Sequence, residues 1–574
     1  MDKNILSIYL ISKHLMQLFR KGEKVMEKTS SKKYILRISL ILILIVSAFL
    51  SIFAVQNYSS NSSITQSSQL IREKNIPQSG GGAPSEIRKF VDSDKNSQVN
   101  PNGDSQGNQS NVNDNKPKGS NRNMRPGELI GNMQRGDGNS KYLQQLTVYS
   151  VVFLILSCGI YYILRRKEII VDFHDEKYIL ITMLAVGFLL RISASTLMNG
   201  HNDINLFKNW AQVAANGFSQ FYSNARQADY PPFYMYVLAL IGKLASLPIL
   251  NAYYILLLKI PSMAADVITG YFIYKLGKKY LSSSISILLA FFYIFNPAVF
   301  IDSTFWGQVD SFFTLLIVFA IYFLCEKRYV FSSLMFAISV LMKPQGLIFL
   351  PILFFELVRQ RKLKNFIYCA VSFIVAAIII IIPFTFSQES SFWIVNLYSK
   401  TISEYPYASV NAFNFFSFIG ANFKNNNLTL FLFSYHTIGM SFIIITTLIS
   451  WFIYIKGNSR KYISAIGLLQ IAGVFTFSVG MHERYLFPAV ALAIVAFIYL
   501  RDKKFFSLAI GFSITSYINI AVVLFGTTAS TFNIFLRGTS FLNILLVIYL
   551  VKILLENALK KVSNNLSTDG REVL

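Results

Sequence analysis

The chain has little cysteine and few acidic residues, and each shortage narrows the class of protein. Its three cysteines, Cys158, Cys325 and Cys369, all lie inside apolar runs. Their spacing fits neither a metal site nor a disulfide framework, so we expect them to be packing residues. Acidic residues number 29 against 53 lysines and arginines, which gives a net charge of +24. A surplus of this size raises the question of a nucleic-acid partner.

Charge of either sign is scarce for a soluble protein. Charged residues make up 14% of the chain and hydrophobic ones 53%, whereas soluble domains have about 25% charged residues. Several stretches are nearly free of charge and long enough for a hydrocarbon core of about 30 Å. They are continuously apolar instead of alternating, and lipid tolerates no unpaired backbone, so helices are predicted. By span length we expect an all-α, polytopic integral membrane protein with about 14 transmembrane helices.

The basic residues gather in short clusters beside these apolar runs. The clusters include RRKE at 165–168, KLGKK at 275–279, RQRKLK at 359–364, KGNSRK at 456–461 and RDKK at 501–504. This pattern is typical of cytoplasmic loops, accounts for the surplus and argues against nucleic acid. We therefore predict a multi-pass protein of the plasma membrane. Its outer segments are expected at 196–230, 296–310, 385–430, 480–485 and 526–540.

Composition divides the chain into five segments. They are a basic cytoplasmic segment at 1–33, a signal-anchor helix or cleaved signal peptide at 34–57, a tether at 58–142, a multispanning domain at 143–557 and a cytoplasmic tail at 558–574. The tether is rich in Asn, Ser, Gly and Gln, so we expect it to be extracytoplasmic and disordered. Two runs leave the helix count open. Residues 231–262 must cross twice or re-enter, and LMKPQG at 341–346 splits 329–359 into two short helices.

Ionisable residues that no cytoplasmic loop explains fall on the predicted outer side. They are Asp203, Lys208, Asp229, Asp266, Asp302, Asp310, Lys343, His482, Glu483 and Arg484. A charge in the middle of a spanning helix costs about 2.5–3.5 kcal/mol on insertion scales, and such residues usually face a cavity or a partner. Several of them at one depth predict a site.

Each motif also has a purely structural interpretation. DYPP at 229–232 is consistent with a helix start capped by Asp229, and HERY at 482–485 with an interfacial anchor. FWGQVD at 305–310 is consistent with a glycine kink and a belt tryptophan. Lys343 would then reach outward from a broken helix, and Asp266 would pair with Lys259. The amphipathic stretch after Asp203 would lie on the membrane surface, with Leu206, Trp210 and Val213 as its apolar face.

The order of these motifs resembles the GT-C superfamily of glycosyltransferases, which use polyprenyl-phosphate sugars. The motifs are Asp203 with Lys208 and Trp210, then DYPP, an Asp at 266, WGQVD, KPQ and HER. The chain looks closest to bacterial proteins similar to the second mannosyltransferase of glycosylphosphatidylinositol assembly. It is more distantly similar to the glucosyltransferases that extend lipid-linked oligosaccharides. The resemblance covers roughly 180–500, and these motifs in this order are quite specific.

The resemblance implies a GT-C-like fold with an extracytoplasmic catalytic loop, and it assigns roles to particular residues. In the family, an acidic residue of the first large outer loop is the catalytic base, and that position matches Asp203. DYPP begins the helix after this loop, and the HER triplet lies near the donor phosphate. This chain has Asn202 and Asn205 around Asp203 instead of a second acid. A paired-acid metal site is therefore not expected. A divalent cation is left as an open alternative, and no cofactor is assigned.

Sidedness then predicts the chemistry. An outward-facing enzyme has no access to cytoplasmic nucleotide sugars, so a polyprenyl-phosphate sugar is the expected donor. Asp203 would take the proton of the acceptor hydroxyl in an inverting displacement. Arg484 would bind the donor phosphate, with His482 and Lys343 as further candidates. The residues expected to bind sugar or acceptor, or to orient the basic groups, are Asp229, Asp266, Trp306, Gln308, Asp310 and Glu483. Tyr405, Tyr407, Asn411 and Asn414 are candidates for an acceptor path.

The predicted function is transfer of a single hexose, most simply mannose, to an extracytoplasmic glycan, lipid or protein. Three alternatives remain open at this point. A transporter or flippase would carry charges through the full membrane depth and internal repeats, which we do not see. A cell-surface glycan polymerase or ligase would join preassembled chains. A membrane scaffold would only display the 58–142 tether.

Overall fold

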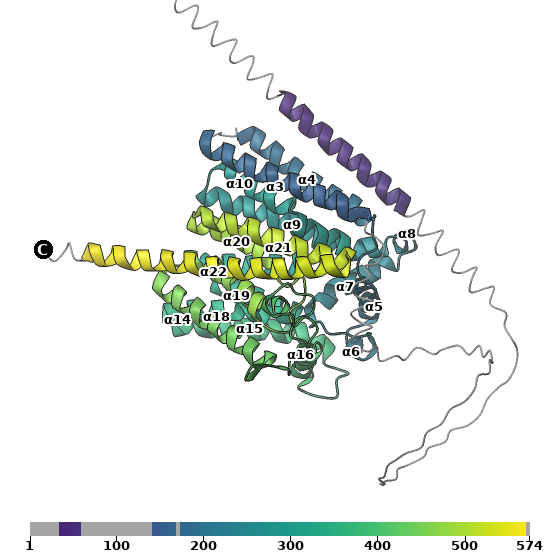
Figure 1. Ribbon diagram of the computed structural model, residues 1–574. Coiled ribbons are helices and arrows are strands. Elements are labelled where there is room, and N and C mark those ends of the chain that lie inside the picture. Colours follow the sequence, from purple (N-terminus) through teal and green to yellow (C-terminus); the bar gives the residue numbers. More distant parts are fainter. Residues whose placement is uncertain (1–33, 59–140, 168–172, 570–574) are drawn as a thin grey trace, which may run out of the picture.

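The computed structural model describes residues 34–58, 141–167 and 173–569. The predicted basic segment 1–33, nearly all of the 58–142 tether and the last residues of the tail lie outside this part. The described residues form a bundle of roughly parallel and antiparallel helices (Figure 1). Their β structure, apart from isolated bridges, is one short hairpin of β1 (Thr429–Leu430) and β2 (Phe433–Ser434). The all-α prediction is confirmed at this level.

Nine helices of the described residues are long and apolar enough to cross a membrane. They are Tyr34–Tyr58, α3 (Lys141–Lys167), α4 (Phe173–Ser195), α9 (Tyr254–Tyr280), α10 (Ser283–Ile294) continued by α11 (Pro297–Ile301) and η1 (Asp302–Trp306), α15 (Leu363–Ile381) continued by η3 (Ile382–Phe384), α18 (Tyr435–Gly457), α21 (Lys503–Phe525) and α22 (Ala529–Asp569). Most leave apolar side chains exposed, as helices in contact with lipid do. The chain is thus a multi-pass membrane protein.

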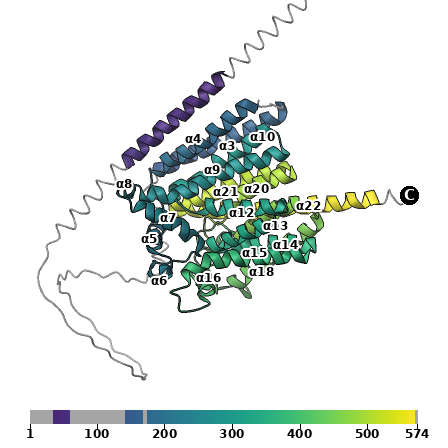
Figure 2. The same cartoon turned by 180° about the vertical axis from the view of Figure 1, so that it is seen from behind.

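Shorter helices complete the bundle. They are α12 (Asp310–Cys325), α13 (Tyr329–Met342), α14 (Leu350–Gln360), α19 (Ile463–Phe477, preceded by η4, Arg460–Tyr462) and α20 (Pro488–Leu500). Figure 2 shows α12, α13, α14 and α20 from behind. Nearly every residue of α19 and α20 is buried, because these helices are apolar all round. The predicted elbow is confirmed: Lys343 is extended after α13, and η2 (Pro344–Phe349) leads into α14. The total of about 14 spans stays a prediction.

Short elements gather at one end of the bundle, which we call the loop end. Figure 1 shows α5 (Asp203–Asn216), α6 (Phe221–Asn224), α7 (Phe233–Ala245), α8 (Pro248–Asn251) and α16 (Trp393–Ser403) there. The hairpin and α17 (Phe415–Phe418) belong to the loop between α16 and α18. Residues 231–262 therefore form α7, α8 and the start of α9, with α7 packed along α5.

The apolar face of α5 is buried in protein. Its buried residues are Ile204, Phe207, Trp210, Ala211 and Ala214. Trp210 also donates a hydrogen bond from Nε1 to the backbone oxygen of Arg226, at 2.7 Å. The interpretation of this stretch as a helix held by the membrane surface alone is therefore wrong. The apolar residues at helical spacing in α5 pack against α7 and against the loop that follows α5.

Gly242 sets the distance between α5 and α7, and its replacement gives a stability prediction. A Cβ at Gly242 would lie 2.1 Å from the backbone oxygen of Ala211, so Gly242→Ala must push the two helices apart. We expect a loss of about 1–3 kcal/mol, typical of overpacking. Thermal unfolding in detergent measures it. Gly159→Ala is the matched control, because nothing lies within 4 Å of its added Cβ; an equal loss in both variants would contradict the argument.

Two buried cations inside the bundle have partners other than those predicted. Arg191 Nε lies 2.9 Å from Asp266 Oδ2, with both side chains fully buried. The ammonium group of Lys259 instead donates to three backbone oxygens near the loop end, including those of Met198 at 2.6 Å and Thr304 at 2.7 Å. The expected pair of Asp266 with Lys259 is therefore wrong. Lys259 thus ties the end of α4 to η1 beside the cavity described below.

Candidate active site

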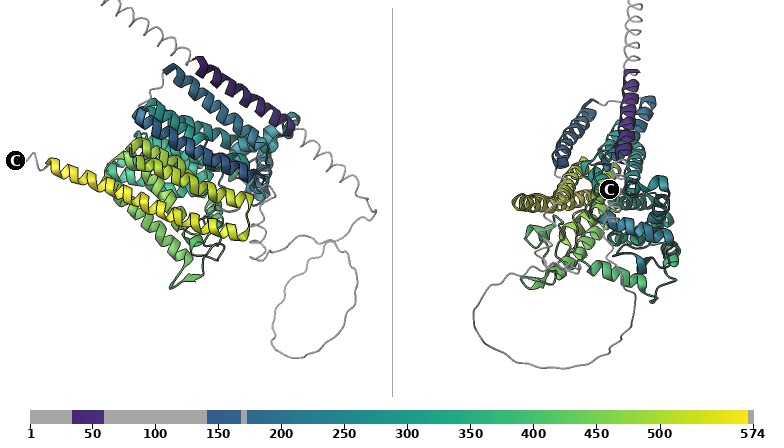
Figure 3. Two further views of the ribbon diagram at one scale, coloured as in Figure 1. Left: turned by 45° about the horizontal axis from the view of Figure 1, so that its top comes forward. Right: turned by 90° about the vertical axis from the view of Figure 1, so that its right-hand side faces the viewer.

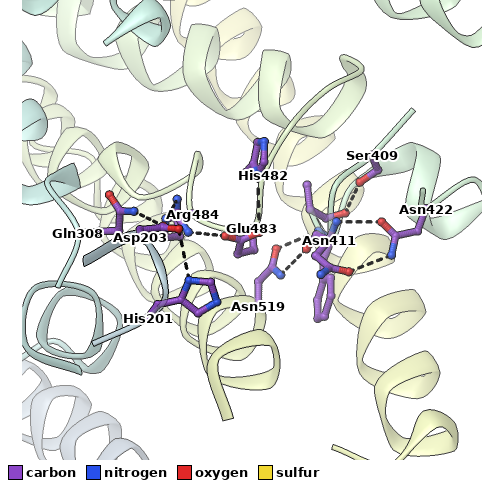
Figure 4. Close-up of polar contacts among 12 residues, drawn as sticks. His201, Asp203, Gln308, Ser409, Asn411, Asn422, His482, Glu483, Arg484 and Asn519 are labelled. Carbon is purple, nitrogen blue, oxygen red and sulfur yellow. Dashed lines mark hydrogen bonds and ion pairs between the residues drawn. The ribbon is translucent and has the colours of Figure 1, made fainter. Parts of the chain in front are cut away.

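A polar cavity of about 270 Å³ opens at the loop end. Its lining includes His201, Asp203 and Trp210 from α5 and the loop before it, Asp229 and Tyr230, Trp306 and Gln308, Tyr405 and Asn411, and His482 to Tyr485. These residues come from five separate stretches of sequence, which helix packing brings to one place (Figure 4). The cavity contains seven of the ten predicted site residues: Asp203, Asp229, Trp306, Gln308, His482, Glu483 and Arg484.

Asp203 is the first residue of α5, and its two oxygens have different neighbours. Oδ2 accepts a hydrogen bond from Gln308 Nε2 at 2.5 Å and lies 3.4 Å from Trp306 Nε1. Arg484 Nη2 is also 3.4 Å from Oδ2. On the other side, His201 Nδ1 lies 3.4 Å from Oδ1. One oxygen is thus held by several donors, whereas Oδ1 faces only an imidazole.

The surroundings keep the Asp203 carboxyl group ionised. Burial opposes ionisation, but the neighbouring His201 and the charge of Arg484 outweigh it, so the pKa of Asp203 lies well below its usual range. Its side chain is 30% exposed, through the cavity. Asp203 is therefore a carboxylate at physiological pH that substrate can reach.

Arg484 lies at the centre of the charged groups. Its Nη1 is 2.5 Å from Glu483 Oε1, its Nε is 3.5 Å from Asp310 Oδ2, and its guanidinium carbon lies 4.5 Å from the centroid of the Trp306 ring. Burial disfavours the cation, yet the charges of Glu483 and Asp203 raise the pKa of Arg484 above its usual value. A permanent cation, stacked on an aromatic ring, is fixed at the wall of the cavity.

His482 is a wall of the cavity and carries no charge. Burial and the nearby charge of Arg484 lower its pKa to about 3. Its backbone pairs with Val410 and Asn411, and its ring meets the Tyr405 ring edge-on at 4.5 Å. His482 is therefore a neutral neighbour of the Arg484 cation, and its role at the donor phosphate stays a prediction. A neutral imidazole can still donate one hydrogen bond.

Lys343, Asp310 and Asp266 are not among the residues that line the cavity. Lys343 is buried and forms an ion pair with Asp310, whose other oxygen is the one near Arg484. The interpretation in which Lys343 reaches outward is wrong, because the elbow after α13 turns it toward α12 instead. Asp266 is held by Arg191, as described above. Lys343 and Asp310 thus support Arg484 from behind, and Asp266 belongs to the interior of the bundle.

Asp229 lines the cavity beside the loop that precedes α7. Burial and the charge of Glu404 raise its pKa to about 7. DYPP does lie at the start of α7, as expected, but the cap position is Pro232 and no side chain caps the helix, so the expected cap by Asp229 is wrong. Thr401 of α16 donates to the backbone oxygen of Asp229 at 2.8 Å, which ties the DYPP segment to α16.

The loop after α16 supplies the remaining wall. Tyr405 and Asn411 line the cavity, and Tyr407 and Asn414 do not. Asn411 has a positive φ of 54° and is held on both sides, by Asn422 through two hydrogen bonds and by Asn519 Nδ2, which donates to its backbone oxygen at 2.8 Å (Figure 4). Asn414 caps α17 and bonds backbone oxygens near the end of α19. The loop is therefore fixed by asparagines rather than by apolar packing alone.

His201 and Tyr230 are cavity residues that sequence reasoning missed. Both stand beside residues that were predicted: His201 precedes Asp203 by two positions, and Tyr230 follows Asp229. The sequence did contain a signal for them, because a polar or aromatic residue next to a proposed site residue is expected to lie at the same site. Within the described residues, no group of three or more His, Cys, Asp or Glu side chains could hold a metal ion.

Comparison with protein families gives one match, and it overlaps this site. Residues 229–385 match the family described as dolichyl-phosphate-mannose-protein mannosyltransferase. The match begins at DYPP and includes WGQVD and MKPQG, and it covers little more than a quarter of the chain. A comparison with curated proteins found no match.

The match supports the superfamily and leaves the closer resemblance, to the second mannosyltransferase of glycosylphosphatidylinositol assembly, a prediction. Dolichyl phosphate is a polyprenyl phosphate, so the matched family also indicates the class of donor. The nine apolar helices agree with a membrane enzyme of this kind. The match thus indicates a glycosyltransferase of the GT-C type that uses a polyprenyl-phosphate sugar, and the apolar helices indicate a multi-pass membrane protein.

Proposed function

We propose that this protein transfers a single hexose, mannose, from a polyprenyl phosphate to a glycan, lipid or protein acceptor outside the plasma membrane, with inversion. The observation that carries the proposal is the pairing of Asp203 with Arg484, 3.4 Å apart at the edge of one cavity. A base for the acceptor and a cation for the leaving phosphate are the two groups that this displacement needs. Mannose is chosen because the matched family's name specifies it.

The chemistry follows from the two oxygens of Asp203. The acceptor oxygen attacks the anomeric carbon, its proton passes to Oδ1, and the bond from that carbon to the phosphate oxygen breaks. Oδ2 stays bound to Gln308 and keeps the carboxylate aimed. A carboxylate with a lowered pKa is a weak base, but the acceptor hydroxyl becomes acidic as the new bond forms. His201, 3.4 Å from Oδ1, helps to keep the carboxylate ionised before the acceptor arrives.

Arg484 provides the charge for the leaving group. The phosphate loses its sugar and gains negative charge as the bond breaks, and a guanidinium binds two phosphate oxygens at once. Glu483 and Asp310 hold the guanidinium in place before the donor arrives. Because the cation is preorganised, it needs no reorganisation in the transition state.

Placement of the site outside the membrane is supported by the ends of the helices. Lys278 and Lys279 end α9, and Arg359 and Arg460 lie near the ends of α14 and α18. These basic residues belong to the end of the bundle opposite the cavity. Basic loops face the cytoplasm, so the loop end and its cavity would face outward.

Sugar transfer in membrane vesicles tests the proposal. Vesicles containing the protein are offered labelled polyprenyl-phosphate hexoses one at a time, and incorporation into membrane and protein fractions is measured. Transfer from the mannose donor in preference to glucose and galactose donors is expected. Equal transfer from all donors would contradict the choice of sugar. Loss of all transfer, together with movement of labelled lipid across the membrane, would favour a flippase.

The titration of Asp229 gives a pH prediction. Its neighbouring charges are Glu404, Lys343 and Asp203. Asp229 is neutral below a pH of about 7 and anionic above it, whereas the donor is a phosphodiester with a constant negative charge. The anionic form should repel the donor phosphate by Coulombic interaction. We therefore expect KM for the donor to rise about fivefold as pH increases from 6 to 8.

Asp229→Asn isolates that effect. The variant should remove the rise in KM between pH 6 and pH 8, while kcat changes little. His482 stays neutral throughout this range because its pKa is about 3, so it adds no titration of its own. Donor titrations at five pH values measure the result, and a rise in KM that persists in Asp229→Asn would contradict the assignment.

A further inference from the structure

The hairpin before α18 carries an apolar tip with the wrong residues for its turn. Thr429 pairs with Ser434 and Leu430 with Phe433, which leaves Phe431 and Leu432 as a two-residue turn. Phe431 has a φ of +58°. Turns of this length favour Asn or Gly where φ is positive, because a large side chain crowds the left-handed backbone. The turn therefore bears a conformational cost that its residues do nothing to relieve.

These side chains also contribute nothing to the core. Phe431 is 92% exposed and Leu432 is 87% exposed. Three asparagines, residues 425–427, end two positions before the hairpin begins at Thr429, so turn-forming residues stand close by in the sequence but not in the turn. Large apolar groups that strain the backbone and pack on nothing in the chain indicate a contact outside it.

The hairpin is joined directly to a membrane-spanning helix. Ser434 accepts a hydrogen bond from the backbone of Thr437 and so caps α18. The exposed face of α18 is apolar and includes Ile444 and Leu448, which are 58% and 59% exposed. The tip extends this lipid-facing surface beyond the start of the helix. In the left view of Figure 3 the hairpin lies at the outer edge of the bundle.

A second exposed apolar strip lies on and before α16, and it too extends the surface of a lipid-facing helix. The lipid-facing helix α15 leads through η3 to Phe386, 79% exposed, and Phe392, 73% exposed. Val395 and Ile402 of α16 are also exposed. We call these four residues, with Phe431 and Leu432, the lipid rim. Both parts of the rim continue a helix face that already contacts lipid.

We propose that the lipid rim inserts into the membrane leaflet at the loop end, as an amphipathic surface does. The segment between its two parts, residues 403–428, contains Tyr405 and Asn411 of the cavity. Its backbone also pairs with the HER loop, where Val410 N donates to the backbone oxygen of Met481 at 3.0 Å. Insertion at both ends of this segment would fix the wall of the active site relative to the bilayer.

Spin labels compare three positions in nanodiscs. Cysteine is introduced at Leu432, at Ile444 on the lipid face of α18, or at Asn427 in the exposed polar loop, after the three native cysteines are replaced by serine. Oxygen collects in lipid, whereas a nickel chelate stays in water. We expect the Leu432→Cys label to resemble Ile444→Cys, with oxygen accessibility severalfold above that of Asn427→Cys. Chelate accessibility like that of Asn427→Cys would overturn the proposal.

A protein partner gives a different result in the same experiment. If a second copy of the chain covered the tip, neither oxygen nor chelate would reach the Leu432→Cys label, and lipid insertion would be wrong. Dilution to one chain per nanodisc would then restore access to one of the two reagents. Both outcomes are independent of sugar transfer, so failure here would leave the proposed function untouched.

A double variant tests what the tip does for the wall. Phe431→Gly with Leu432→Asn places glycine at the position of positive φ, which this turn favours, and removes the apolar tip. We expect severalfold faster hydrogen exchange in residues 403–428 in nanodiscs, with exchange in α18 unchanged. Unchanged exchange in the loop would show that the tip does not hold it. Slower exchange would show that turn strain outweighs the lipid contact.

Discussion

Asp203→Asn is expected to lower kcat/KM for sugar transfer by about 10²–10⁴-fold, the usual contribution of a general base. The amide keeps the size of the side chain and can still contact Gln308, but it cannot accept the acceptor proton. The loss should therefore appear in kcat, with donor KM changed less. Initial rates with labelled donor in membrane vesicles, at equal amounts of folded protein, measure it.

Glu556→Gln is the matched control for this experiment. Glu556 pairs with Lys504 near the end of the bundle opposite the cavity, and the same loss of one carboxylate there should leave transfer unchanged. If Asp203→Asn transfers sugar at the wild-type rate, the base is another group. Asp229, in the same cavity, would then be the next carboxylate to replace.

Arg484→Lys is expected to lower kcat/KM by about 10²–10³-fold, although it preserves the charge. An ammonium group cannot bind two phosphate oxygens in one plane, and it loses the stacking of guanidinium on Trp306. Arg484 meets Glu483 and Asp310 with two different nitrogens, which the single nitrogen of lysine cannot do. Donor titration should show a higher KM together with a lower kcat.

Arg501→Lys controls for the exchange itself, since Arg501 follows α20 at the opposite end of the bundle. The two variants should differ by about 10²–10³-fold in kcat/KM, a difference of about 2.7–4 kcal/mol in transition-state stabilisation. Wild-type kinetics in Arg484→Lys would mean that charge alone suffices. The fixed orientation of the Arg484 guanidinium would then have no role in transfer.

Charge scarcity explains how much of this site was predictable. In a chain with few ionisable groups, those inside apolar runs must face a cavity or a partner, and Asp203, Glu483 and Arg484 were found by that rule together with the resemblance. Asp203 stands at the start of a helix, where a helical period and a loop could both be recognised. The membrane fold followed from run length in the same way.

Partner choice was less predictable, because it depends on how helices rotate and cross. Asp266 was paired with Lys259, seven residues away, yet it binds Arg191 of another helix. Lys343 was placed at the donor phosphate, but the turn after α13 points it at Asp310. Local spacing limits which residues share a helix face and says little about the neighbouring helix. His482 was given a charge because its burial was unknown.

The distances along the chain between the cavity residues have a consequence for biosynthesis. Ribosomes deliver the chain to the membrane from its amino end, so Asp203 is inserted well before Arg484 is translated. Until the segment before α20 arrives, the carboxylate lacks its guanidinium, and Trp306 lacks the cation stacked on it. A nascent chain thus passes most of its insertion without a phosphate site. Catalytic competence appears late, in one step, and a truncated product in the membrane cannot consume donor.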